Sequence, residues 1–155
     1  MINIQVNEDV EALWDRLDVP YEALEEAANE ALYYTRTPID VEITIVLASD
    51  ELLQELNQEY LNIDAPTDVL SFEADFIDPD SEATYLGDLV ISVQRAISQA
   101  QTGNHPLKDE LQLLVVHGVL HLIGYDHIED DEKMVMQQAQ DAILKQLGNS
   151  AGVSL

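Results

Sequence analysis

The sequence predicts an α/β (α+β) fold: a small mixed, mostly parallel sheet with one antiparallel edge strand, packed with about five helices. Three observations predict it. Short runs rich in β-branched residues alternate with longer segments of helical period along the 155 residues. Two predicted strands follow one another with no helix between them, which favours an antiparallel pair at one edge. The segment LQLLVVHGVLHLI is apolar on nearly every side, which is typical of a buried central helix.

The predicted strands combine β-branched residues with alternation or with a continuous apolar run. They cover residues 2–6, 40–47, 68–72 and 86–92. The last two are the pair that we expect to run antiparallel. Residues 73–85 are acidic and contain Pro79, so we expect an exposed loop between these two strands.

The predicted helices carry apolar side chains at a helical period. They cover residues 20–34, 51–60, 92–101, 106–123 and 128–147. Several of their ends are marked: Ser49 or Asp50 can cap the second helix, and Gly124 and Gly148 can end the last two. We expect the fourth helix, which has the most apolar sequence, to lie across the sheet at the centre of the fold.

The composition indicates one domain, residues 1–148, followed by a frayed tail, residues 149–155. No apolar run is long enough to span a bilayer, and the first residues do not resemble a signal peptide, so we expect a cytoplasmic protein without a membrane partner. Thirty-one acidic residues stand against six basic ones, which gives a net charge of -25. Such a chain repels nucleic acid on average, so a metal ion, a few basic groups or a partner would have to hold a polyanionic substrate.

Three of the four histidines lie in the stretch HGVLHLIGYDH, residues 117–127. His117 and His121 are one helical turn apart on one face, and a turn at Gly124 can bring His127 to the same point. Two core histidines are the plain alternative, but they are costly to bury unpaired in an aliphatic helix. Three converging neutral imidazoles suit zinc with one coordination position open. We therefore predict one zinc ion held by His117, His121 and His127.

The spacing H-x-x-x-H-x-x-G-x-x-H is that of the metzincin zinc proteases, whose motif has a glutamate after the first histidine. Here that position is Gly118, so the general base that peptide hydrolysis needs is missing. A metalloprotease is therefore the weakest hypothesis. Zinc held by the histidines can still act as a Lewis acid toward a phosphodiester, with His117 positioning the activated water.

Three stretches together resemble one family. HGVLHLIGYDH is similar to the signature of the YbeY family, zinc-dependent endoribonucleases of rRNA maturation, and PTDVLSF (66–72) and LGDLVIS (86–92) resemble two further stretches of that family in the same order. The resemblance implies that the three histidines of the motif are zinc ligands on a metzincin-like helix. It also implies that the substrate is single-stranded RNA or rRNA. The implied role is processing of the 3′ end of the small-subunit RNA and ribosome quality control, with the small subunit or its proteins as partners.

The sequence departs from that family at Leu61, where the resemblance implies an arginine that supports catalysis or RNA binding. A leucine cannot hold a phosphate. Arg95 and Lys108 are the candidates to replace the arginine, although residues of this kind are more often surface residues that aid solubility. Asp126 is a candidate to orient a ligand histidine, with a turn-forming aspartate as the alternative, and Ser71 is a candidate to face the metal.

Two residues near the start of the histidine helix receive structural interpretations. His105 precedes a proline and reads as a cap or a surface residue. Glu110 shares a face with His117 but lies about 10 Å away along the helix axis, which is too far for direct base catalysis.

The favoured hypothesis is a hydrolase, a zinc-dependent endoribonuclease specific for single-stranded RNA. The alternative from another class is a ribosome-assembly factor in which the zinc is mainly structural and nuclease activity is weak or absent. The net charge of -25 and Leu61 both favour the alternative.

Overall fold

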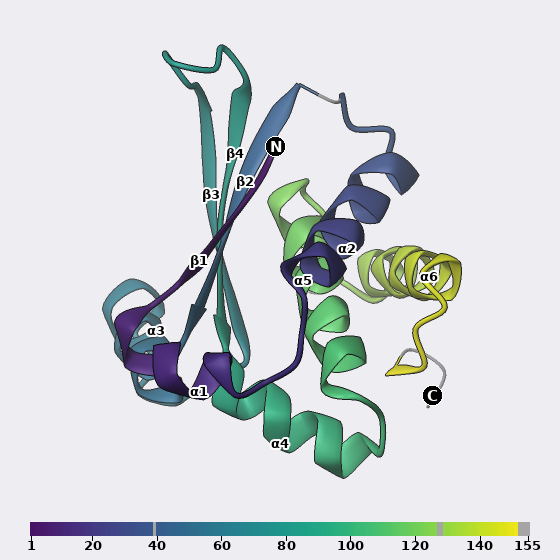
Figure 1. Cartoon of the computed structure of the whole chain (residues 1–155). Coiled ribbons are helices and arrows are strands. Elements are labelled where there is room, and N and C mark those ends of the chain that lie inside the picture. The colour runs from purple at the N-terminus through teal and green to yellow at the C-terminus, as the bar shows by residue number, and fades with distance from the viewer. Residues whose placement is uncertain (39, 127–128, 152–155) are drawn as a thin grey trace.

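The computed structural model of the chain describes residues 1–38, 40–126 and 129–151. Within these residues, four strands form one sheet in the order β1-β2-β4-β3, and six α-helices lie around it (Figure 1). The strands are β1 (Ile2–Val6), β2 (Val41–Ala48), β3 (Val69–Ile77) and β4 (Thr84–Ser92). The helices are α1 (Glu11–Asp15), α2 (Tyr21–Tyr34), α3 (Asp50–Leu61), α4 (Val93–Gly103), α5 (Leu107–Leu122) and α6 (Asp130–Gln146), with a 3-10 helix at Glu8–Val10 before α1.

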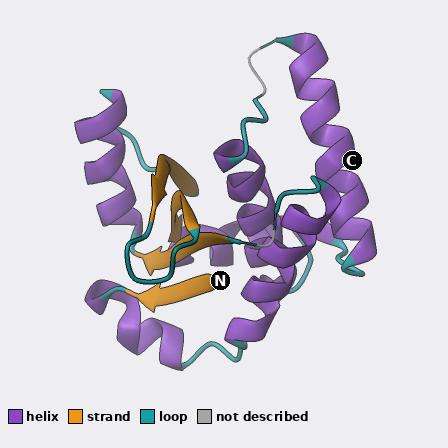
Figure 2. Ribbon diagram, turned by 90° about the horizontal axis from the view of Figure 1, so that it is seen from above, coloured by secondary structure: helices purple, strands orange, loops and turns teal. Residues whose placement is uncertain are grey.

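The pairing of the strands confirms the predicted fold class. β2 pairs in parallel with both β1 and β4, and β3 pairs antiparallel with β4 at the edge. Helices lie on both sides of this sheet (Figure 2). The main core joins one face of the sheet to α2, α5 and α6, and a smaller cluster lies between the other face and α3. Because side chains alternate across a strand, each inner strand contributes to both clusters.

α5 runs through the middle of the molecule and contacts α2, α4, α6, β3 and β4. Its residues are buried on nearly every side, as the apolar sequence predicts. At Gly118 the helix lies directly on β4: a Cβ added there would be 2.7 Å from Cδ2 of Leu89. Although α5 is the most apolar of the helices, no helix in the described ranges is long and apolar enough to cross a membrane.

The β3–β4 hairpin is longer than the sequence predicts. β3 continues to Ile77 and β4 begins at Thr84, so the predicted loop over 73–85 is wrong for all but its central turn. The acidic side chains Glu73 and Asp75 are exposed. Because β3 is an edge strand, these charges face water without preventing the pairing with β4, and charge on an edge strand also discourages pairing with another chain.

Both ends of the chain hold more structure than predicted. At the start, α1 and the 3-10 helix bring Trp14 into the core. At the end, Asn149 is buried, and its amide donates to the Asp109 carbonyl oxygen and to the Gln112 side chain, each at 3.0 Å. The prediction of a frayed tail from residue 149 is therefore wrong as far as residue 151, because buried polar groups of α5 need these partners. Residues 152–155 lie outside the described residues.

Candidate metal centre at the end of α5

His117 and His121 lie one turn apart near the C-terminal end of α5, with their imidazoles facing each other. The two Nε2 atoms are 3.2 Å apart, and the ring centroids are 4.7 Å apart at an interplanar angle of 71°. Both side chains are half-buried. Two nitrogen ligands of one tetrahedral zinc ion, with bonds of about 2.0–2.1 Å, lie about 3.3 Å apart. The spacing of the histidine pair therefore fits two ligands of a single ion.

Gln140 of α6 orients the first of these imidazoles. Its Oε1 lies 3.0 Å from Nδ1 of His117. An amide oxygen only accepts hydrogen bonds, so the Nδ1–H of His117 donates to it and Nε2 keeps the lone pair that a metal ion needs. The sequence did not point to Gln140, because it lies on the next helix and a glutamine carries no metal-site signature.

α5 ends directly after the histidine pair in a Schellman motif. The amide of Gly124 donates to the carbonyl of His121 at 3.0 Å, and the amide of Tyr125 donates to the carbonyl of Leu120 at 2.9 Å. Gly124 has the predicted positive φ, at 109°. The predicted third ligand, His127, lies outside the described residues. Among the residues that are described, no three histidine, aspartate or glutamate side chains group closely enough to hold a metal ion, so the three-ligand site stays a prediction.

Ser71 joins the edge strand to the helix turn that carries the pair. Its Oγ donates to the carbonyl oxygen of Gly118 at 3.3 Å, and Gly118 is the residue after His117. Because position 118 faces Leu89 of β4, a carboxylate there, as in the metzincin motif, would meet the sheet and not the histidines. The structure thus gives a packing reason for the glycine at this position.

The other three candidates lie at separate places. The guanidinium of Arg95 donates two hydrogen bonds of 3.0 and 2.9 Å to Asp50, and this contact holds the pKa of that carboxyl below its usual range. Lys108 lies in the first turn of α5, about 13 Å along the helix axis from His117. Asp126 lies in the turn after α5 and lines a shallow hollow of about 390 Å³ between this turn and α6.

His105 is not the cap or surface residue that the sequence suggests. Its Nε2 lies 2.6 Å from Oε1 of Glu110, and the two side chains are 8% and 5% exposed. The buried Glu110 carboxylate needs a strong donor, and an imidazole in the loop before α5 supplies it. Glu110 is thus occupied at the start of the helix, which agrees with the expectation that it is not the base for chemistry at His117.

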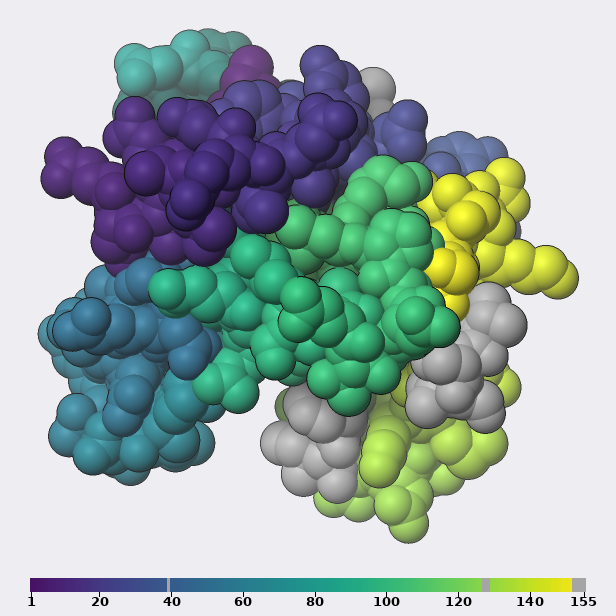
Figure 3. Space-filling model, turned by 60° about the horizontal axis from the view of Figure 1, so that its bottom comes forward, coloured from purple at the N-terminus to yellow at the C-terminus, as the bar shows by residue number. Residues whose placement is uncertain are grey.

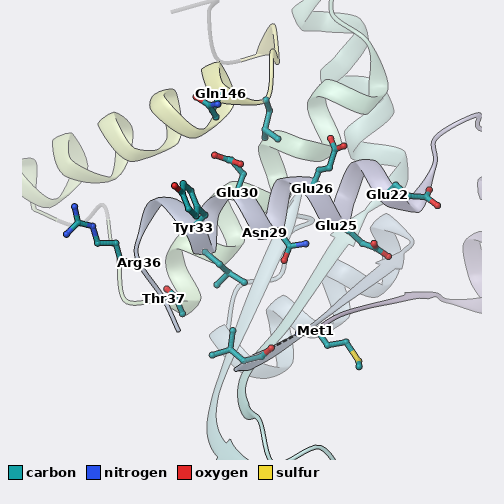
Figure 4. Close-up of a pocket in the computed structure, with 13 residues that line it drawn as sticks. Met1, Glu22, Glu25, Glu26, Asn29, Glu30, Tyr33, Arg36, Thr37 and Gln146 are labelled. Carbon is teal, nitrogen blue, oxygen red and sulfur yellow. Dashed lines mark hydrogen bonds between the residues drawn. The ribbon is translucent and has the colours of Figure 1, made fainter. Parts of the chain in front are cut away.

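A larger hollow, of about 1050 Å³, lies elsewhere, between α2, the start of β2 and the end of α6 (Figure 4). Its acidic lining comes from one helix and comprises Glu22, Glu25, Glu26 and Glu30. Figure 4 shows these carboxylates spread along α2, pointing in different directions. Because they do not converge on one point, this hollow is an open acidic groove, and the histidine pair remains the better candidate for chemistry.

The mixed sheet and its central helix with two facing imidazoles define an α/β protein with a candidate histidine metal centre. A family model described as "Endoribonuclease YbeY" matches residues 9–148. Of the curated proteins named "Endoribonuclease YbeY", that of Heliobacterium modesticaldum is 44% identical over 135 residues, 81% of each chain. That of Lachnoclostridium phytofermentans is 40% identical over 141 residues, which cover 80% of this chain and 86% of the relative.

A solved structure agrees with these matches. The solution structure of TM1509 from Thermotoga maritima is similar with a TM-score of 0.57 and 25% sequence identity, over 97% of this chain and 95% of that one. The chain belongs to the YbeY endoribonuclease family, and it is a hydrolase. RNA is the substrate class that this membership implies.

Proposed function

We propose that the chain is a zinc-dependent endoribonuclease that cleaves single-stranded RNA. Its role would be rRNA maturation in the cytoplasm, at the 3′ end of the small-subunit RNA, together with ribosome quality control. One observation carries the proposal: in a member of an endoribonuclease family, two imidazoles on the buried helix face each other at 3.2 Å. The orientation of His117 by Gln140 supports it further.

His117 and His121 would hold the zinc ion, with His127 as the predicted third ligand. A bound zinc ion supplies Lewis acidity and lowers the pKa of bound water toward about 7. The protein contributes rigidity: α5 is buried on nearly every side, and the Gln140 contact keeps His117 in the tautomer with a lone pair on Nε2. The Ser71 hydroxyl fixes the edge strand against the same turn of the helix. These contacts keep the reacting groups in place without reorganisation.

The test is cleavage of a labelled single-stranded RNA by untagged, zinc-loaded protein. It is run beside a chelated sample and two variants, His121→Ala and Gln137→Ala. The second variant is the control, because the Gln137 side chain contacts Asp141 on the outside of α6. We expect cleavage by the wild type and by Gln137→Ala, and none in the other two samples. Intact RNA after incubation with fully metallated wild type, with ribosomal RNA included, would refute the nuclease.

The second candidate function is a ribosome-assembly factor that binds small-subunit proteins and uses the zinc ion mainly for stability. The net charge of -25 and the exposed Leu61 favour it, because neither provides a contact to the phosphates of RNA. In this case His121→Ala should lower the melting temperature, while pull-down of small-subunit proteins stays intact below that temperature. Loss of cleavage with an unchanged melting temperature would exclude it.

A further inference from the structure

An apolar groove lies between the end of α3 and β3. Its volume is about 370 Å³. The residues that line it are mostly apolar or aromatic: Leu56, Tyr60, Leu61, Leu70, Ser71, Phe72 and Glu73. We call it the α3–β3 groove. Its aromatic side chains form an edge-to-face pair, with the ring centroids of Tyr60 and Phe72 5.3 Å apart at 72°.

The exposed side chains of this groove are not needed for the core. Tyr60 and Leu61 are 59% and 56% exposed, whereas Leu53 on the inner face of α3 is fully buried. The loop after them is well held: the Asn57 side chain donates to the carbonyl of Ala65 at 3.0 Å. These exposed side chains are contiguous with the apolar lining of the groove, and a contiguous exposed apolar patch marks a binding surface.

The groove lies across β3 from the histidine pair. Successive side chains of a strand point to opposite faces, so Leu70 and Phe72 face α3, while Ser71 faces α5 and donates to the Gly118 carbonyl. β3 is the edge strand, so no further strand separates the two sites on this side. Figure 3 shows the surface hollowed beside the blue-teal part of the chain that contains α3. A single strand of nucleic acid could therefore cross the edge of β3 from the groove to the histidines.

The charges favour an uncharged ligand group in the groove. Among its described lining residues there is no lysine or arginine, and Glu73 lies at one end. Arg95 is engaged by Asp50, and the chain has only six basic residues. A phosphate would be repelled here, but the face of a nucleobase carries no charge and stacks on aromatic rings whatever its sequence.

We propose that the α3–β3 groove binds an unpaired nucleobase of the RNA substrate against Tyr60 and Phe72. This contact positions the strand across β3 so that the neighbouring phosphodiester reaches the histidine pair. The inference rests on the proposed function for its substrate class. In place of contacts to phosphates, the chain then holds RNA largely through a base, which reconciles RNA binding with its acidic surface.

The experiment measures the affinity of full-length protein for a labelled, unstructured single-stranded RNA by fluorescence anisotropy, with a chelator present so that the RNA stays intact. The variants are Tyr60→Ala, Tyr60→Phe and, as the matched control, Tyr33→Ala, because Tyr33 is a 79% exposed tyrosine on α2. Loss of one base stack should raise the Kd for Tyr60→Ala by about fivefold or more. Tyr60→Phe and Tyr33→Ala should bind as the wild type does.

Two further measurements identify the ligand as a base. In a series of RNAs that each carry one abasic site, the abasic site at one position should weaken binding by the wild type. With that RNA, Tyr60→Ala and the wild type should have the same affinity. The slope of log affinity against log salt should be no steeper than about -1.4, the value for two phosphate contacts to a single strand. A steep slope together with wild-type affinity in Tyr60→Ala would overturn the proposal, and the groove would then be left to a protein partner.

Cleavage by zinc-loaded wild type, run in parallel, separates this proposal from the nuclease proposal. If the wild type cleaves RNA and Tyr60→Ala binds RNA with wild-type affinity, only the proposal for the groove is overturned. Tyr60-dependent binding without cleavage overturns the nuclease and supports the groove. Absence of RNA binding together with absence of cleavage overturns both.

Discussion

At the start of α5, the His105 imidazole lies 2.6 Å from the Glu110 carboxylate, whereas near its end the His117 and His121 imidazoles lie 3.2 Å from each other. The first pair is almost fully buried. The second is half-buried, and its first imidazole contacts the neutral amide of Gln140. The two ends of one helix thus surround the same type of side chain with different partners.

The difference in partners separates a structural histidine from a candidate metal ligand. The Nε2 atom of His105 is already occupied by the Glu110 carboxylate, and both side chains are buried, so this nitrogen is not open to a metal ion. At His117 the amide oxygen of Gln140 accepts from the other ring nitrogen, Nδ1–H, so Nε2 keeps the lone pair that a metal ion needs. The position of a histidine in the sequence leaves its role open, and the side chain beside it in the structure assigns that role.

The largest effect on activity is expected at the end of the helix. His121→Ala should reduce cleavage of single-stranded RNA by more than about a hundredfold, beyond the ten- to hundredfold typical of the partners that orient ligands. The side chain is half-buried and outside the core, so unfolding by urea should change little. Zinc content and cleavage rate are the measurements. If His121→Ala lost stability but retained cleavage, His121 would be a structural residue and not a metal ligand.

The largest effect on stability is expected at the start of the helix. Glu110→Leu leaves the buried His105 imidazole without its partner, which should lower the free energy of unfolding by on the order of 3 kcal/mol. Zinc content and cleavage by the folded protein should stay at wild-type values. Glu110→Gln keeps an acceptor oxygen and should lose less. Urea unfolding measures both variants, and a drop in zinc content in Glu110→Leu would show that the two ends are coupled.

A smaller effect is expected for the amide that orients His117. Gln140→Leu should weaken zinc binding by about ten- to a hundredfold, because the imidazole loses the acceptor that holds its tautomer. Gln137→Leu on the same helix is the matched control, since the Gln137 side chain donates to the surface residue Asp141 and not to a histidine of the pair. Competition with a chelating dye measures both affinities. Equal affinities in the two variants would remove Gln140 from the site.

The smallest effect is expected for Asp50 and Arg95, an exposed counterpart of the buried His105–Glu110 pair. Arg95→Gln should lower stability by less than about 1 kcal/mol, because both side chains are about one-third exposed to solvent. The hydrogen bond from Arg95 lowers the pKa of Asp50 below its ordinary value of 3.8. The contribution is therefore present at neutral pH and is lost as the pH falls below about 4.

Thermal unfolding of wild type and Arg95→Gln between pH 7 and pH 2 measures this contribution, and the two curves should converge at low pH. A difference that persists at pH 2 would show that the pair does not act through the Asp50 charge. RNA affinity of the same variant tests the substrate role that the sequence suggests for Arg95. A loss of affinity without a loss of stability would support that role.

Much of the fold follows from local patterns. The alternation in β2, the apolar sequence of α5 and the glycine after it predicted a strand, the central helix and its end. The acidic composition of residues 73–85 led to the wrong prediction of a loop, because an edge strand can carry charges that an inner strand cannot. The predicted frayed tail fails in the opposite way, because Asn149 satisfies a buried polar group of α5 that lies far from it in the sequence.

By itself the sequence determined that two histidines share one face of a buried helix and that a glycine ends this helix, because helical spacing and backbone sterics act over a few residues. Only the tertiary structure decided which partners the histidines have. Gln140 and Ser71 reach the histidines or their helix through the packing of α6 and of β3 against α5. Such contacts depend on how segments far apart in the sequence pack together, and the spacing of residues within one segment does not predict that packing.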